Sequence, residues 1–187
     1  TPDISILSEE FLKEVQKMPH KNLAVELLNK LINDQVKSKF KTNIVKQKKF
    51  SDLLQNALSK YQNRSIEAAQ VIAELIEMAK DFKKDIEKTE ELNLDYAENA
   101  FYDALSNNKS AEDLMGEEVL IQIAREVAEK LRQNVSIDWS VRESVRARLR
   151  LIVKNLLRKY KYPPDDQDEA VELVLSQAEI VSQELVE

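Results

Sequence analysis

Residues 65–91 read SIEAAQVIAELIEMAKDFKKDIEKTEE, and this stretch decides the fold class of the chain. Its apolar side chains recur every third or fourth residue, from Ile66 through Ile72 to Phe82. That spacing places them on one face of an α-helix. The segment has no glycine or proline, and its alanine, glutamate and lysine favour helix. We therefore expect one long helix that packs its apolar face into a core.

The composition extends the helical prediction to the whole chain. Its 187 residues include one glycine, four prolines and no cysteine. Strands joined by tight turns use glycine to reach positive φ, so a single glycine argues against a sheet protein. The other segments also repeat apolar residues at helical spacing between short breaks. We predict an all-α fold, a compact bundle of about seven or eight helices, at 8–18, 21–40, 43–61, 65–91, 95–105, 117–133, 140–160 and from 165 onward.

Gly116 is the only glycine, so other residues must supply the left-handed backbone with which many helices end. Asparagine adopts that conformation more readily than most residues. We expect asparagine to fill most of these positions, at Asn63, Asn93, Asn107, Asn108 and Asn134.

The length suits a single domain. Residues 106–109, of sequence SNNK, and the nearby Gly116 form the clearest group of helix breakers. We predict one helical domain over 1–187, with a soft break at 106–116 that would divide it into two helical subdomains. The chain begins with threonine rather than methionine, and we expect it to be a fragment of a longer protein.

Charge is arranged in four blocks that the net charge of −6 conceals. Residues 1–64 carry a net +5 and residues 140–161 a net +7, whereas 65–139 carry −10 and 162–187 carry −8. The plain interpretation is that oppositely charged helices pair within the molecule. The functional alternative is that the basic blocks form patches that bind DNA or an acidic protein. The charge pattern alone favours the plain interpretation.

The densest basic block is the predicted helix 140–160. A basic residue recurs there at every fourth position, so the row runs along the helix and drifts slowly around it. Arginine predominates, and its planar guanidinium forms paired hydrogen bonds with carboxylates or phosphates. We predict contacts with a partner or with DNA from this row and from a lysine cluster before Phe50, namely Arg142, Arg146, Arg150, Lys154, Arg158, Lys46, Lys48 and Lys49.

The residue types that usually carry catalysis are missing. There is no cysteine, and His20 is the only histidine, which excludes thiolate and multi-histidine metal sites. No phosphate-binding glycine loop and no serine elbow occurs. Residues 81–83 have the acid-x-lysine spacing of metal-dependent nucleases, but they lie in a predicted helix where a strand would be needed. We predict no catalytic, cofactor-binding or metal-binding residue in this chain.

Four segments carry a family resemblance: DWSVRESVRA at 138–147, LLRKY with YPPD at 156–165, NIVKQKKFS at 43–51 and AFYDAL at 100–105. They resemble the C-terminal helical domain of the R (motor/endonuclease) subunit of type I restriction-modification enzymes. Trp139, in the first segment, alternates with polar neighbours and is expected to pack inward from an extended link. Lys161 departs from the family pattern, which usually has glycine before Tyr-Pro-Pro, so the local helix end is in question.

The resemblance implies a non-catalytic assembly domain. Such a domain would dock an ATP-dependent DNA translocase and endonuclease onto the methyltransferase and specificity subunits of the restriction complex. The alternative is a helical module of the same subunit that contacts the backbone of double-stranded DNA independently of sequence. By resemblance, the parent subunit is an ATP-dependent type I site-specific deoxyribonuclease. Its ATP and Mg sites would lie outside this fragment, for which we expect no cofactor.

The chain has no apolar run near the roughly 20 residues that cross a bilayer. Its first residues do not resemble a signal peptide. Together with the resemblance, these features lead us to expect no membrane partner and a location in the cytoplasm of a bacterium or archaeon.

Overall fold

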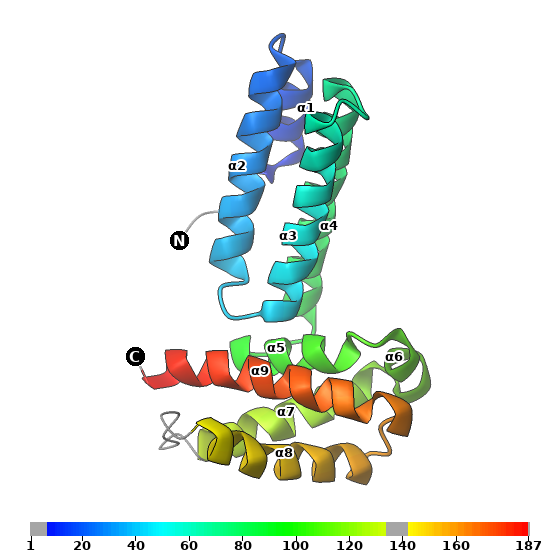
Figure 1. Ribbon diagram of the computed structural model, residues 1–187. Coiled ribbons are helices and arrows are strands. Elements are labelled where there is room, and N and C mark those ends of the chain that lie inside the picture. Colours follow the sequence, from blue (N-terminus) through cyan, green and yellow to red (C-terminus); the bar gives the residue numbers. More distant parts are fainter. Residues whose placement is uncertain (1–6, 134–141, 187) are drawn as a thin grey trace. The chain divides into compact units, whose positions relative to one another are not determined.

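The computed structural model describes residues 7–133 and 142–186, except for the side chains of Arg142 and of residues 184–186. These residues form nine α-helices and one short 3-10 helix and contain no strand (Figure 1), which confirms the all-α prediction. The helix that the sequence did not predict is α6 (Lys109–Met115). The link that contains Trp139 lies outside the described residues.

The helices belong to two compact units. The first is formed by the chain up to Lys41 and by Lys46–Asn93, and the second by Thr42–Val45 and the chain from Leu94 onward. The division between the two longer segments falls after Asn93, whereas the sequence placed a soft break at 106–116. Residues 106–116 lie within the second unit, where α6 packs against the helices that precede and follow it.

The first unit is a bundle of helices around one apolar core. In it α1 packs on α2 and α4, and α2 packs on α4. The residues of α3 that face this core are Phe50, Leu54 and Ala57. The bundle comprises α1 (Glu9–Lys17), α2 (Lys21–Lys39), α4 (Ala68–Glu91) and all but the first two residues of α3 (Ile44–Gln62).

Three aromatic rings join the helices of the first unit. Phe40 and Phe50 stack with ring centroids 5.8 Å apart, and the Phe82 ring meets both of them edge-on at 5.3 and 5.4 Å. All three side chains are buried. Burying each ring contributes about 2 to 3 kcal/mol, so this cluster anchors α3 to α4 and to the end of α2.

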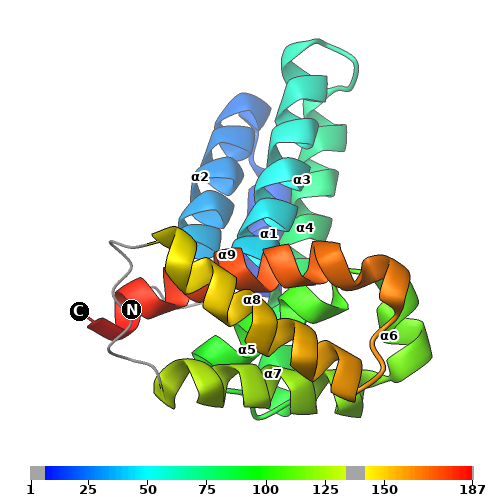
Figure 2. The same cartoon turned by 60° about the horizontal axis from the view of Figure 1, so that its bottom comes forward.

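The second unit is a four-helix bundle with a short helix added (Figure 2). In the bundle α5 packs on α7, α7 on α8, α8 on α9 and α9 on α5, so the four helices enclose one core. Its elements are α5 (Tyr96–Ser106), α6, α7 (Glu117–Gln133), α8 (Arg142–Lys159), the 3-10 helix η3 (Pro164–Asp166) and α9 (Gln167–Val186).

Positive φ angles occur at four described residues, and asparagine is only one of them. Asn93 has φ 54°, as predicted, but Arg64 and Lys161 adopt φ 58° and 59°. Arg64 ends α3 in place of the predicted Asn63, and Asn107 and Asn108 have negative φ. The fourth residue is Gly116, and Asn134 lies outside the described residues. The expectation that asparagine would fill most of these ends was therefore wrong.

Candidate functional site

Helix α8 carries the middle of the predicted basic row, Arg146, Arg150 and Lys154, on the side that faces α9. The apolar face of the same helix is formed by Val145, Leu149 and Val153, which are buried. Arg146 and Arg150 flank that face and are only partly exposed, at 17% and 36% of the side chain. The row therefore lies at the edge of a helix–helix contact.

The row forms ion pairs with α9. The Arg146 guanidinium lies 3.1 Å from a Glu172 carboxylate oxygen and 3.3 Å from one of Glu179. Two nitrogens of Arg150 donate to a single Glu172 oxygen at 2.9 and 2.7 Å. Lys154 lies 3.7 Å from Asp168. Since the partners run backward along α9 as the row runs forward along α8, the two helices are antiparallel. We name this set of contacts the ionic seam.

The seam changes the acidity of its central carboxyl group. Hydrogen bonds from Arg150, and secondarily from Arg146, lower the pKa of Glu172 below its usual value. Both favour the ionised form. Half of the Glu172 side chain is exposed, however, so solvent screens these contacts. The seam therefore selects how α8 lies on α9 more than it stabilises the fold.

The ends of the predicted row differ from its middle. The Arg142 side chain lies outside the described residues. Arg158 is exposed and forms no ion pair with any residue that the structure describes. Beside it, Tyr160 donates a hydrogen bond of 2.5 Å to Glu126 of α7, which lowers the pKa of Glu126.

The three predicted lysines of α3 are held within the first unit. Lys46 and Lys49 both pair with Asp85 of α4, at 3.3 and 3.1 Å. Lys48 pairs with Asp52 one helical turn away, at 2.8 Å. The Lys48 side chain is 78% exposed and Lys46 only 18%. These lysines belong to the first unit, whereas the α8 row belongs to the second.

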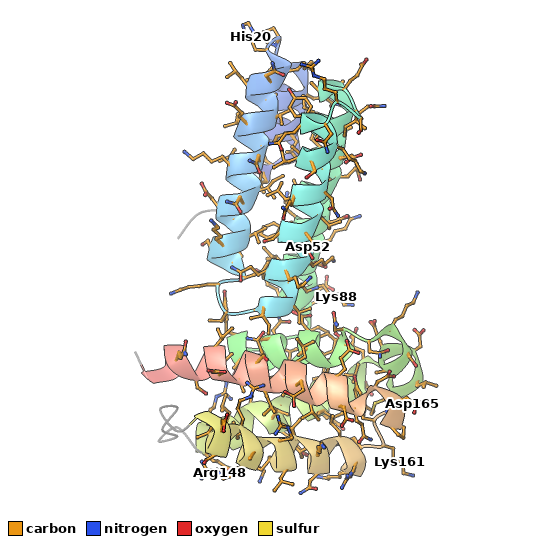
Figure 3. The ribbon with its side chains drawn as sticks, viewed as in Figure 1. His20, Asp52, Lys88, Arg148, Lys161 and Asp165 are labelled. Atoms are coloured by element: carbon orange, nitrogen blue, oxygen red, sulfur yellow. The ribbon has the colours of Figure 1, made fainter. Side chains whose placement is uncertain are left out.

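Lys161 ends α8 in the conformation that glycine usually supplies. The Tyr162 amide donates to the Leu157 carbonyl at 2.8 Å, and the Lys161 amide donates to that of Arg158 at 3.1 Å. These two bonds are the Schellman pattern, which needs a left-handed residue at position 161. The departure from the family pattern therefore leaves the helix end intact. Figure 3 shows Lys161 and Asp165 at the turn from α8 toward α9.

The turn places Tyr162 inside the second unit. Its side chain is 1% exposed, and its hydroxyl donates to the Leu105 carbonyl of α5 at 2.8 Å. Burial raises the pKa of Tyr162 to about 12. The Gln167 amide group donates to the Tyr162 carbonyl at 2.9 Å. The aromatic residue between Lys161 and the two prolines thus fixes the α8–α9 connection to α5.

A group of buried polar residues was not predicted at all. Asn43 donates to a carboxyl oxygen of Asp103 at 2.6 Å, and Asn99 donates to the same oxygen at 3.3 Å. Gln177, which is fully buried, accepts from the Ile44 amide at 2.9 Å and donates to the Thr42 carbonyl. We name Thr42, Asn43, Asn99, Asp103 and Gln177 the polar cluster. It binds the segment 42–45 to α5 and α9.

The sequence held a weak signal for this cluster. Asn99 and Asp103 lie one helical turn apart on α5, on a face where Ala100 and Leu105 are buried. A pair of polar residues inside an apolar stripe indicates a buried partner, because unpaired buried polar groups are costly. Nothing local indicates that Asn43, the partner of Asp103, lies 60 residues away, or that Gln177 meets Ile44 across 133 residues.

Sequence reasoning also missed Arg148. This residue projects from α8 (Figure 3) and is exposed. It forms no ion pair with any residue in 7–133 or 142–186 whose side chain the structure describes. Leu151, one turn further along, is 64% exposed. Arg148, which is not part of the predicted row, and Arg158, its last member, lie on the outer side of α8.

The described residues contain no group of three or more histidines or carboxylates that could hold a metal ion. Within the same residues, no helix is long and apolar enough to cross a membrane. His20 lies at the turn between α1 and α2 (Figure 3).

Comparison with known proteins assigns the family. The family described as "Type I restriction enzyme HindI endonuclease subunit-like, C-terminal" matches residues 1–184. The chain is 46% identical over 184 residues to the type I restriction enzyme HindI endonuclease subunit of Haemophilus influenzae. It is 32% identical over 159 residues to the putative type I restriction enzyme MjaIXP endonuclease subunit of Methanocaldococcus jannaschii. No solved structure matches.

The fold and the site define an all-helical module in which part of the basic row pairs internally. The chain belongs to the family of C-terminal regions of HindI-like type I restriction endonuclease subunits. The two matches cover 98% and 84% of this chain but only 17% and 15% of the relatives, so the chain spans about a sixth of their length. The family resemblance predicted from four segments is confirmed.

Proposed function

We propose that this chain is a non-catalytic assembly domain, which docks an ATP-dependent DNA translocase and endonuclease onto a methyltransferase–specificity core. The family membership supports a place in a restriction complex. The observation that favours docking over DNA contact is the ionic seam. Arg146, Arg150 and Lys154 are paired with α9, so the strongest basic block of the chain serves internal structure.

The alternative function, contact with the backbone of double-stranded DNA, rests on different residues. Arg148 and Arg158 are exposed on the outer side of α8 and have no ion pair among the described residues. Two arginines supply a weak, salt-sensitive attraction to phosphates. The seam residues would have to exchange their carboxylate partners for phosphates. We therefore rank DNA contact second.

The activities of the longer relatives belong to this proposal as well. We propose that the parent subunit binds ATP and Mg and carries the nuclease chemistry, and that it is located in the cytoplasm. Among the residues that the structure describes, no group of three or more histidines or carboxylates could hold a metal ion.

The docking role is tested by titrating purified methyltransferase–specificity core with this chain at moderate salt, with calorimetry as the readout. The longer subunit that carries the chain is the positive control. A complex formed by both supports the proposal. Binding by the longer subunit alone contradicts it.

The DNA alternative is tested by the salt dependence of binding to a short duplex. Replacing Arg148 and Arg158 by glutamate should abolish binding and flatten the salt slope. The matched control replaces the exposed Lys13 and Lys30 of the first unit by glutamate, which changes the net charge equally. Equal loss in both variants, or none in either, counts against a site on α8.

A further inference from the structure

The first unit has a groove between α3 and α4 that neither the family nor the basic row explains. It is an open groove with a volume of about 470 Å³. Leu53, Ala57, Ala73 and Met78 supply its apolar floor. These side chains come from the two helices that the aromatic rings join.

The groove follows from side-chain size along the two helices. Phe50 and Phe82 lie between α3 and α4 with ring centroids 5.4 Å apart, and such rings hold helices well separated. Two turns beyond Phe50, α3 presents Ala57, and α4 contributes Ala73. Methyl groups do not fill the space that phenyl rings set. The result is a channel in which Leu53 stays 42% exposed.

The rim of the groove is acidic. Glu74, Glu77 and Asp81 line it from α4, together with Lys60, and Glu77 also lies 3.6 Å from Lys80. Lys60 lies 3.9 Å from Glu74, at the limit of an ion pair, and both side chains are about half exposed. The rim therefore keeps an excess of negative charge.

We propose that this groove receives an amphipathic helix of a partner protein, with apolar residues on one face and lysine or arginine on its flanks. A channel between two antiparallel helices is the shape that accepts a third helix through residues spaced three and four apart. The acidic rim selects basic flanks and repels the phosphates of nucleic acid. The inference deepens the proposed function, on which it rests only for the identity of the partner.

The groove can be tested with a designed peptide, independently of the restriction subunits. The probe is an 18-residue helical peptide with leucine on one face and lysine on the flanks, labelled for fluorescence anisotropy. Its counterpart carries glutamate in place of lysine. We expect the lysine peptide to bind this chain and the glutamate peptide to bind at least about tenfold more weakly.

Substitutions locate the binding. Leu53→Asp should weaken the lysine peptide at least about tenfold, whereas Leu23→Asp, on α2 and 54% exposed, should leave it unchanged. Glu77→Lys with Asp81→Lys should weaken it similarly. Glu117→Lys with Glu118→Lys, at the start of α7, provides the same charge change outside the groove. Equal effects of the paired variants, or no binding by the wild type, would overturn the inference.

The same variants separate this inference from the proposed function. If the wild type binds the methyltransferase–specificity core and Leu53→Asp does not, the groove inference and the assembly function are both supported. If the wild type and Leu53→Asp bind the core equally, the groove is not the docking site and the assembly role stands. Wild-type dimerisation that Leu53→Asp abolishes, measured by sedimentation, would assign the groove to a second copy and overturn the choice of partner.

Discussion

The second unit joins its helices by two polar devices that differ in burial. In the polar cluster, Asn43, Asp103 and Gln177 are between 0% and 6% exposed. Asn43 donates a hydrogen bond to Asp103, and Gln177 accepts one from the Ile44 amide. In the ionic seam, Arg150 and Glu172 carry full charges but remain 36% and 50% exposed. Water weakens the contact between Arg150 and Glu172, whereas the groups of the cluster lie where an unmade hydrogen bond is expensive. Arg146 and Glu179 of the seam are less exposed, at 17% and 16%.

This difference assigns the two devices different tasks. Breaking a buried hydrogen bond leaves a group without either protein or water, at about 1 to 3 kcal/mol for each group. Breaking an exposed ion pair returns two charges to water, at about 0 to 1 kcal/mol. The cluster should therefore decide whether segment 42–45 stays bound, while the seam only adjusts how α8 lies on α9.

The largest effect should come from Asp103→Leu. Loss of the carboxyl leaves the Asn43 and Asn99 amide groups without that acceptor, and we expect about 3 kcal/mol of destabilisation. Urea unfolding followed by circular dichroism measures it. Asp103→Asn keeps one acceptor oxygen and should cost less. If Asp103→Leu lowered the free energy of unfolding by less than about 1 kcal/mol, the polar cluster would stabilise the fold no more than the ionic seam does.

Gln177→Leu should cost about 2 kcal/mol, because the Ile44 amide and the Thr42 carbonyl both lose their side-chain partner. Hydrogen exchange of the Ile44 amide should accelerate with it. Gln183→Leu, at an exposed position of the same helix, is the control. Unchanged protection of Ile44 would show that the segment is bound by other contacts.

Lys161→Gly should stabilise the second unit by about 1 kcal/mol, since glycine adopts positive φ without the strain of a side chain. Lys161→Ala keeps the Cβ atom and should give no gain. Urea midpoints of the three proteins provide the comparison. A destabilised glycine variant would mean that the lysine side chain supports the turn in a way that the backbone does not reveal.

Arg150→Ala should cost only about 0.5 kcal/mol. The coupling with Glu172, measured by a double-mutant cycle with Glu172→Ala, should shrink as sodium chloride is added. A coupling energy as large as the stability loss of Gln177→Leu would mean that the seam stabilises the fold as strongly as the buried polar cluster does.

The smallest effect concerns pH. The folded pKa of Glu172 is lowered from its usual 4.5, so its contribution is present above that value and is lost as pH falls through the folded pKa. The stability difference between the wild type and Glu172→Gln should therefore narrow as the pH drops below about 4.5. Urea midpoints across this range test it, and a difference independent of pH would contradict the assigned cause.

The regular features of the fold were predictable because they repeat locally. The helical period identified Ile72 and Phe82 as core residues, and both are buried. The charge blocks favoured internal pairing, and the seam provides it for one basic block. The polar cluster could not be predicted, because Gln177 meets Thr42 across 135 positions of sequence. The α3–α4 groove could not be predicted either, because the distance between the two helices depends on Phe50 and Phe82 facing each other across them.

The polar cluster also bears on how the chain folds during synthesis. Thr42 and Ile44 are synthesised 133 to 135 residues before their partner Gln177. Until then the second unit lacks a helix, α9, that its bundle requires. The first unit can form its aromatic core as soon as Phe82 has emerged, because Phe40 and Phe50 precede it. The second unit is therefore completed late, through contacts between residues far apart in the sequence. A fragment beginning at Leu94 would lack the segment 42–45 that Gln177 contacts.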